Sequence, residues 1–331
     1  MSRMERNLGF ELVRATEAAA LRAARWMGRG LREACDQAAV DAMRFVLDNI
    51  AMDGIVVIGE GEKDQAPMLY IGERLGTGAP PQVDIAVDPV EGTSLLAHGQ
   101  PGAIAVVAVA ERGSLFGCRE VVYMDKLVVG EEAREVVDLD APVAENLRRV
   151  ARAKGKDVDD LTVVVLDRPR HAELIRQIRE AGARISLIAH GDVAPAIQAM
   201  MSGSDVDLLM GIGGAPEAVI AACAARCLNG GIFCRLWPRD EAEREAAQAA
   251  GLDLGKIWTV DDLVRSEDVF LAATGITTGS FLRGVRYFGR GATTHSVVMR
   301  SASGTVRYIE ATHRWDKLMR ISALPFDRSG A

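Results

Sequence analysis

The sequence has few of the features that place a protein in a membrane or on a nucleic acid. None of its apolar runs approaches the roughly 20 residues needed to cross a bilayer, and its first residues lack the apolar core of a secretory signal. It also lacks an excess of positive charge. Its formal net charge of −7 would repel nucleic-acid phosphates. We therefore expect a cytoplasmic protein with no membrane partner and no nucleic-acid partner.

The cysteines lack any pairing pattern. The five cysteines are Cys35, Cys118, Cys223, Cys227 and Cys234, and none of them forms a CxxC pair. Cys223 and Cys227 are one helical turn apart, which is typical of small buried side chains. The sequence therefore predicts a reduced protein without disulfides or structural zinc.

Helical and strand patterns alternate along most of the 331 residues, a length that exceeds what one core usually fills. We expect two lobes, at 1–155 and 156–331, with the charged segment 138–160 crossing between them. Helices are predicted at 11–27, 33–50, 172–181, 192–201 and 216–228, and strands at 54–58, 83–87, 103–110, 126–129, 161–166, 184–188, 206–210, 269–276, 294–300 and 305–310. The short connections indicate a layered α/β fold, and the last three strands are expected to be partly antiparallel.

Two carboxylates stand at the end of an apolar strand, in the stretch VDIAVDPVEGTSLL. Asp88 and Glu91 flank Pro89, which is expected to end the strand, and Gly92 frees the backbone to turn. Thr93 can then begin a helix whose N–H groups face an anion. Oxygen ligands beside such amides suit a divalent cation bound to a phosphate. The alternative is a pair of solvated loop carboxylates with a threonine cap.

Three more acidic residues occupy similar positions. Glu60 lies between glycines after the strand 54–58, and Glu217 begins a helix after the strand 206–210. Asp36 belongs to the apolar stripe of the helix 33–50, since it precedes Val40 by four residues. A buried carboxylate needs a cation or a basic partner. Together these residues predict a metal-binding constellation, although Glu217 alone is also consistent with a helix-capping carboxylate.

A dinucleotide site is a competing interpretation of the glycine-rich turn at 211–214. The turn follows a strand, as the G-x-G-x-x-G motif of Rossmann folds does. Pro216 stands where the third glycine would be, so the pattern disfavours a dinucleotide site.

The segment IAVDPVEGTSLLAHG resembles the D-P-x-D-G-T motif of the lithium-sensitive, metal-dependent phosphomonoesterases, which include inositol monophosphatases and fructose bisphosphatases. Glu91 in place of the second aspartate is typical of class II fructose-1,6-bisphosphatases. Five further segments resemble that class in the same order over nearly the whole chain: RATEAAALRAARWMGRG, VVIGEGEKDQAPMLYIGE, YMDKLVVG, GIGGAPEAV and ATGITTGSFLRGV.

This resemblance implies a fructose-bisphosphatase-like layered α/β/α/β/α sandwich that hydrolyses the 1-phosphate of fructose 1,6-bisphosphate with two or more Mg²⁺ or Mn²⁺ ions. In some photosynthetic members the same protein also cleaves sedoheptulose 1,7-bisphosphate, and a homo-oligomer (dimer or tetramer) is expected. The implied metal ligands are Asp36, Glu60, Asp88, Glu91 and Glu217. The implied substrate residues are Glu91, Gly92, Thr93, Tyr123, Arg168, Pro169, Arg170, His190, Gly191, Asp192 and Gly214.

The resemblance also assigns roles within this set. Asp36, Glu60 and Thr93 would orient and activate the attacking water, with Glu60 as the base because a threonine alone is a poor one. Arg168 and Arg170, on either side of a stiffening proline, would bind the distal phosphate through their planar guanidinium groups. Solvated loop arginines are the alternative.

The chain departs from the class pattern at a few positions. His190 stands where the class usually has an aspartate, so the choice between six- and seven-carbon sugars stays open. Leu31 and Glu33, ahead of Asp36, also differ. An inositol- or other sugar-phosphate phosphatase on the same scaffold is the first alternative function, and a non-catalytic metabolite sensor is the second. DPVEGT and DRPRH favour a bisphosphate substrate.

Overall fold

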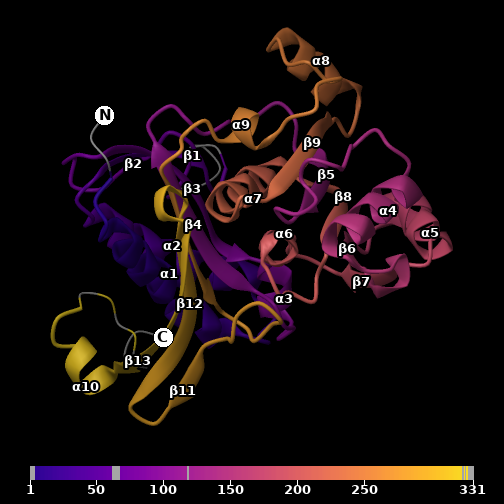
Figure 1. Cartoon of the computed structure of the whole chain (residues 1–331). Coiled ribbons are helices and arrows are strands. Elements are labelled where there is room, and N and C mark those ends of the chain that lie inside the picture. Colours follow the sequence, from indigo (N-terminus) through magenta and orange to yellow (C-terminus); the bar gives the residue numbers. More distant parts are fainter. Residues whose placement is uncertain (1–3, 62–67, 118, 323, 325, 327–331) are drawn as a thin grey trace. The chain divides into compact units, whose positions relative to one another are not determined.

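The computed structural model describes residues 4–61, 68–117, 119–322, 324 and 326, and the chain folds into two compact units (Figure 1). Unit 1 comprises Met1–Gly113 and Asp268–Ala331, and unit 2 comprises Ser114–Glu267. Among the described residues, no helix is long and apolar enough to cross a membrane.

These units divide the chain differently from the expected lobes at 1–155 and 156–331. The chain leaves unit 1 after Gly113 and returns to it at Asp268, because the strand β10 (Val269–Gly275) pairs antiparallel with β4 (Ile104–Glu111). Local sequence patterns predict each strand but do not indicate which distant strand is its neighbour. The segment 138–160 lies within unit 2 and contains the helix α4 (Val143–Lys154).

Unit 1 is built on an eight-stranded sheet. Its order is β11 (Arg286–Phe288), β12 (Gly291–Arg300), β10, β4, β3 (Gln82–Glu91), β1 (Asp53–Ile58) and β2 (Arg74–Leu75), and β13 (Thr305–Arg314) pairs with β12. Its neighbouring strands are antiparallel apart from β1 and β3, which are parallel. The expected antiparallel arrangement of the C-terminal strands is therefore confirmed.

The helices α1 (Leu8–Ala23) and α2 (Arg32–Asp48) pack on each other, and α1 also packs on the strands of this sheet. The alanine-rich face of α1 is fully buried at Ala15, Ala19 and Ala20, which lets the helix lie close to the sheet. The shorter elements of unit 1 are η1 (Ala24–Trp26), α3 (Thr93–Ala97), η4 (Ser301–Ser303) and α10 (Trp315–Leu318).

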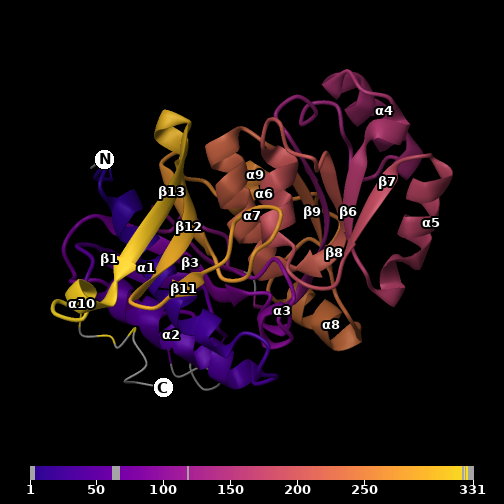
Figure 2. The ribbon, with the colours of Figure 1, turned by 90° about the horizontal axis from the view of Figure 1, so that it is seen from below.

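Unit 2 has a five-stranded sheet between two layers of helices (Figure 2). The strand order is β7 (Arg184–Ile188), β6 (Thr162–Leu166), β8 (Leu208–Gly214), β5 (Tyr123–Val129) and β9 (Gly231–Trp237). The helices α4 and α5 (Ala172–Glu180) cover one face, and α6 (Val193–Met200) and α7 (Ala215–Leu228) cover the other. The remaining elements are η2 (Val158–Asp160), η3 (Pro169–His171), α8 (Glu241–Ala249) and α9 (Val260–Leu263). Each unit thus stacks helices on a mixed sheet, as expected for an α/β fold.

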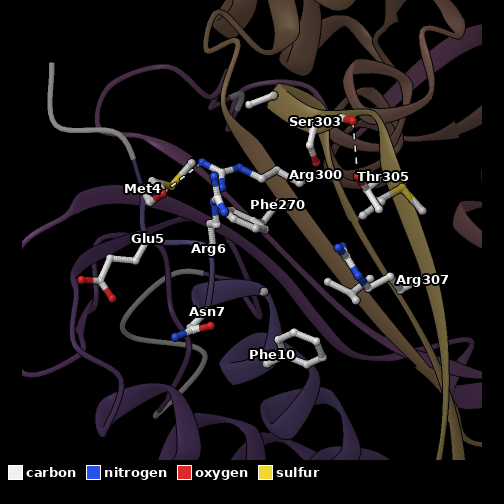
Figure 3. A pocket seen from close by; sticks show the side chains of 14 residues that line it. Met4, Glu5, Arg6, Asn7, Phe10, Phe270, Arg300, Ser303, Thr305 and Arg307 are labelled. Carbon is white, nitrogen blue, oxygen red and sulfur yellow. Dashed lines mark hydrogen bonds between the residues drawn. The ribbon is translucent and has the colours of Figure 1, made fainter.

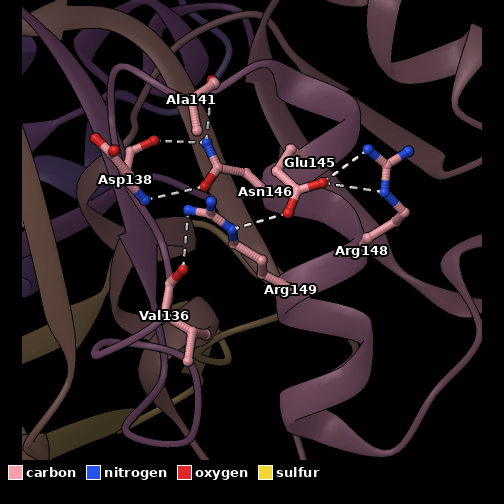
Figure 4. Close-up of polar contacts among 7 residues, drawn as sticks. All are labelled: Val136, Asp138, Ala141, Glu145, Asn146, Arg148 and Arg149. Carbon is pink, nitrogen blue, oxygen red and sulfur yellow. Dashed lines mark hydrogen bonds and ion pairs between the residues drawn. The ribbon is translucent and has the colours of Figure 1, made fainter.

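Side-chain contacts order the beginning of α4, in the segment that was expected to connect the lobes (Figure 4). The Asn146 amide donates to the Asp138 carbonyl oxygen at 2.7 Å and accepts from the Asp138 N–H at 3.0 Å. Glu145 accepts hydrogen bonds from Arg148 and Arg149. Leu147 is fully buried on the opposite face, so the charge-rich segment is an amphipathic helix.

Candidate active site

Four of the predicted metal ligands belong to unit 1 and come from three neighbouring elements. Asp36 lies on α2, Glu60 follows β1, and Asp88 and Glu91 belong to β3. Because β1 and β3 are parallel neighbours, Glu60 and the two β3 carboxylates emerge at the same edge of the sheet. The elements therefore gather residues that are far apart in the sequence.

The β3 strand does not stop at Pro89, contrary to the sequence-based expectation. Its pairing with β4 continues to Glu91, with a register shift between Asp88 and Glu91. Within this bulge the Val90 N–H donates to the Asp88 carboxylate at 3.0 Å. Bulges of this kind redirect side chains, and here the bulge separates the two carboxylates.

A hydrogen-bonded chain links three of these residues. The Asp36 carboxylate bonds to the Glu60 carboxyl group and to the Thr93 hydroxyl. Thr93, the first residue of α3, also lies 3.0 Å from the Val90 carbonyl oxygen through its hydroxyl. The three residues assigned to water activation by the resemblance are therefore in contact with one another.

The electrostatics of this cluster favour a cation. Burial, together with the negative charges of Asp36 and Asp88, raises the pKa of Glu60 to about 9. Burial also raises the pKa of Asp36. Without a cation the cluster holds a proton at neutral pH, which relieves the repulsion among its carboxylates.

Unit 2 contributes the fifth predicted ligand, Glu217, in the first turn of α7. The residue is half-buried, but its Oε2 atom is buried and has no hydrogen-bond partner among the described residues. Burial raises its pKa, the charge of Asp192 adds to this effect, and the charge of Lys126 opposes it. A buried carboxylate oxygen with an unused lone pair is a suitable ligand for a hard cation.

In the part of the chain that is described, no three His, Cys, Asp or Glu side chains form a ready-made metal site. The five predicted ligands divide between the units, four in unit 1 and Glu217 in unit 2. Their chemistry nevertheless fits divalent cations. A cation can displace the proton held by Glu60, and the unpartnered Oε2 of Glu217 can coordinate a cation.

The predicted substrate residues of unit 2 gather at one edge of its sheet. Tyr123 begins β5 and pairs with Gly214, the last residue of β8. The parallel strands β6 and β7 end at the same edge, before the segments that contain Arg170 and His190. The full set at this edge is Tyr123, Arg168, Pro169, Arg170, His190, Gly191, Asp192 and Gly214.

The two arginines have different surroundings. The Arg170 guanidinium lies 4.9 Å from the centre of the Tyr123 ring and donates to the Ile212 carbonyl oxygen at 2.8 Å. Arg168 lies 3.2 Å from His190 Nδ1. Neither contact neutralises the positive charge of the arginine, so both charges remain available to an anion.

His171 and Lys126 were not assigned to the site from the sequence. His171 is almost fully buried; its Nδ1 donates to the Leu166 carbonyl oxygen and its Nε2 accepts from the Ile212 N–H, each at 2.7 Å. It therefore fixes η3 to β8 as a neutral imidazole, and burial lowers its pKa. Lys126 follows Asp125 within the otherwise uncharged strand YMDKLVV, and a lysine in such a strand could have marked it.

A cavity in unit 1 is lined by none of the predicted site residues (Figure 3). It has a volume of about 510 Å³ and lies beside Phe10, Phe270 and Arg307. Arg300, at its wall, forms an ion pair with Asp268 at 2.7 Å.

Leu31 and Glu33, the two positions ahead of Asp36 at which the chain departs from the class pattern, are exposed at the beginning of α2.

Comparison with known proteins gives matches over almost the whole chain. The sequence profile described as bacterial fructose-1,6-bisphosphatase, glpX-encoded, matches residues 6–313. The chain is 44% identical to a protein of Synechococcus sp. (strain JA-2-3B'a(2-13)) named D-fructose 1,6-bisphosphatase class 2/sedoheptulose 1,7-bisphosphatase, over 95% of this chain and 97% of that protein. It is 45% identical to fructose-1,6-bisphosphatase 1 class 2 of Escherichia coli (strain K12), with the same shares covered.

Proposed function

The chain belongs to the family of glpX-encoded bacterial fructose-1,6-bisphosphatases, and from this membership we propose that it removes the 1-phosphate of fructose 1,6-bisphosphate to give fructose 6-phosphate and phosphate. The single observation that supports this chemistry best is the contact chain from Glu60 through Asp36 to Thr93, at the edge of the sheet where Asp88 and Glu91 emerge. Sedoheptulose 1,7-bisphosphate is a second substrate, since the Synechococcus relative carries both activities in its name.

Divalent cations, Mg²⁺ or Mn²⁺, are the expected cofactors. Two or more ions would be held by Asp36, Glu60, Asp88, Glu91 and Glu217. When bound, such ions neutralise phosphate charge and lower the pKa of a coordinated water.

The residues of the contact chain handle the proton. Glu60 would accept the proton of the attacking water in its carboxylate form, and a bound cation would supply that form by displacing the proton that the raised pKa of Glu60 retains in the cation-free cluster. Asp36 orients Glu60 through their hydrogen bond and at the same time fixes the Thr93 hydroxyl. The three residues therefore form a preorganised relay that needs no rearrangement during the reaction.

The rest of the substrate is held by unit 2. Arg168 and Arg170 bind the distal phosphate, since neither forms an ion pair with a carboxylate among the described residues. Tyr123 and Asp192 bind sugar hydroxyls. Gly92 of unit 1 and Gly191 of unit 2 have positive φ angles that favour glycine, and together with Gly214 they would present backbone to the substrate, while Pro169 keeps the arginine segment stiff.

His190 affects the choice of sugar in this scheme. A histidine paired with Arg168 leaves the arginine its full charge, whereas an aspartate at that position would form an ion pair with it. We expect this to favour phosphate binding over recognition of a particular sugar hydroxyl.

We also propose that the protein is a cytoplasmic homo-oligomer, a dimer or tetramer.

A phosphate-release assay tests the proposal. The purified protein is incubated with fructose 1,6-bisphosphate, sedoheptulose 1,7-bisphosphate and inositol monophosphate, each with Mg²⁺, with Mn²⁺ and with a chelator. We expect both bisphosphates to be hydrolysed with Mg²⁺ or Mn²⁺ and neither to be hydrolysed with the chelator. Preference for inositol monophosphate would favour the alternative phosphatase, and no turnover of any ester would favour a metabolite sensor.

A further inference from the structure

Lys126 and Asp192 are buried together in unit 2, and the half-buried Glu217 lies near them at the beginning of α7. Lys126 Nζ donates to Asp192 Oδ2 at 2.7 Å, and the two side chains are only 2% and 6% exposed. The Glu217 carboxylate interacts electrostatically with both of them. The cluster therefore combines one positive and two negative charges.

Stability alone is a weak explanation for this cluster. A buried ion pair gains little over an apolar pair of similar volume, because both charges lose their hydration. Lys126 belongs to β5, an inner strand of the sheet, whose next residue, Leu127, is packed in the apolar core on the other face. A methionine or leucine at position 126 would pack there without that cost.

The Asp192 carboxylate is turned toward Lys126 instead of toward its own helix. Asp192 is the N-cap residue of α6, a position where aspartate usually accepts a backbone N–H, yet its side chain forms no capping hydrogen bond. The Asp192 carboxylate is thus oriented by Lys126 and not by the backbone N–H groups of α6.

The adjoining glycine turn leaves room for this arrangement. A Cβ atom on Gly213 would overlap Asp192 Oδ2 and lie 2.9 Å from Lys126 Nζ. A Cβ atom on Gly214 would overlap the Glu217 carboxylate. The turn that resembles a dinucleotide motif in the sequence therefore serves to pack backbone against these charges.

We propose that Lys126 is a positioning residue for the sugar-phosphate reaction: it holds the Asp192 carboxylate in the orientation in which that group accepts a sugar hydroxyl. This inference rests on the proposed function, which places Asp192 against the sugar. Lys126 itself contacts the carboxylate and not the substrate. Its removal should therefore weaken substrate binding much more than it slows the chemical step.

The test compares two lysine-to-methionine variants. Lys126→Met removes the proposed positioning contact. Lys156→Met removes a lysine that also lies 2.7 Å from a buried aspartate in unit 2, Asp207, away from the predicted site residues. We expect Lys126→Met to raise KM for fructose 1,6-bisphosphate about 10-fold and to weaken calorimetric binding of fructose 6-phosphate by a similar factor, with kcat changed less than about 3-fold. Lys156→Met should change neither binding quantity and should lower only the melting temperature.

Gly213→Ala is a second route to the same displacement, since it moves the Asp192 carboxylate without removing a charge. It should raise KM as Lys126→Met does, and it decides the question if the lysine variant does not fold. An unchanged KM and an unchanged product affinity in the folded variants would overturn the inference. If the wild-type protein does not hydrolyse the bisphosphate at all, the proposed function fails instead, which is a separate result.

Discussion

Replacing Gly214 with alanine should disable the enzyme without disturbing its backbone. Gly214 has φ −62° and ψ 142°, a conformation that alanine adopts without strain. An added Cβ would lie 2.6 Å from Glu217 Cδ and overlap Oε2, so the carboxylate has to move. Within the protein, the added methyl group therefore acts on the Glu217 carboxylate and leaves the backbone unstrained.

The size of the effect follows from this displacement. Relieving the overlap moves the carboxylate by roughly 1 Å, and a misplacement of that size at a reacting centre costs on the order of 100-fold in rate. We expect kcat/KM for fructose 1,6-bisphosphate to fall by about that factor, which corresponds to about 2.7 kcal/mol of transition-state stabilisation.

The assay is phosphate release at saturating Mn²⁺, with melting temperatures recorded in parallel. Gly289→Ala is the matched control, because a Cβ at Gly289 meets nothing within 4 Å and its φ is not in the left-handed region. If Gly214→Ala kept kcat/KM within about 3-fold of the wild type, the position of the Glu217 carboxylate would be irrelevant to the reaction, and its assignment as a metal ligand would be wrong.

Three further substitutions test other parts of the site. Asp88→Asn should lower kcat/KM by about 100-fold or more, since it removes a charge that would hold the cations; near-normal phosphate release would contradict this role. Arg170→Ala should raise KM about 10-fold for the bisphosphate but not for a sugar monophosphate, and equal effects on both would remove its distal-phosphate role. Burial lowers the pKa of His171 below its ordinary 6.5, so the folded protein binds fewer protons there than the unfolded chain, and stability falls as the pH drops through 6.5. This acid-side loss of unfolding free energy, at most about 1.4 kcal/mol per pH unit for one proton, should shrink in His171→Gln. Melting temperatures recorded against pH measure it, and the exposed control His98→Gln should keep the wild-type pH dependence.

Local structure near the site could be predicted well from the sequence. The strand before Asp88 and the helix that carries Asp36 were both expected within a few residues of their observed bounds. Their signals are strong because apolar periodicity and the position of Thr93 after a glycine are local properties of the chain.

Long-range pairing could not be predicted in the same way. The strand β9 and the helix α4 were missed, since β9 begins at a glycine and carries Arg235 among its apolar residues, and α4 is rich in charge. Pro89 indicated a strand end, but the strand continues through a bulge that depends on its pairing with β4. Lys126 was overlooked because its partner, Asp192, is distant in the sequence and only the fold brings them together.

The discontinuous course of the chain has a consequence for biosynthesis. The end of β4 and the beginning of β10 are paired, Ala110 with Val269, and the two ends of unit 2 are also paired with each other, Leu115 with Val264. All residues of unit 2 have therefore been synthesised once translation reaches Glu267, whereas the sheet of unit 1 still lacks its last four strands at that point. At translation speeds of about 5–20 residues per second, synthesis of unit 2 takes roughly 8–30 s, during which the N-terminal strands have an unfinished edge. The later-synthesised unit can thus fold first, and the earlier segment then depends on the final 64 residues, Asp268–Ala331, to complete its core.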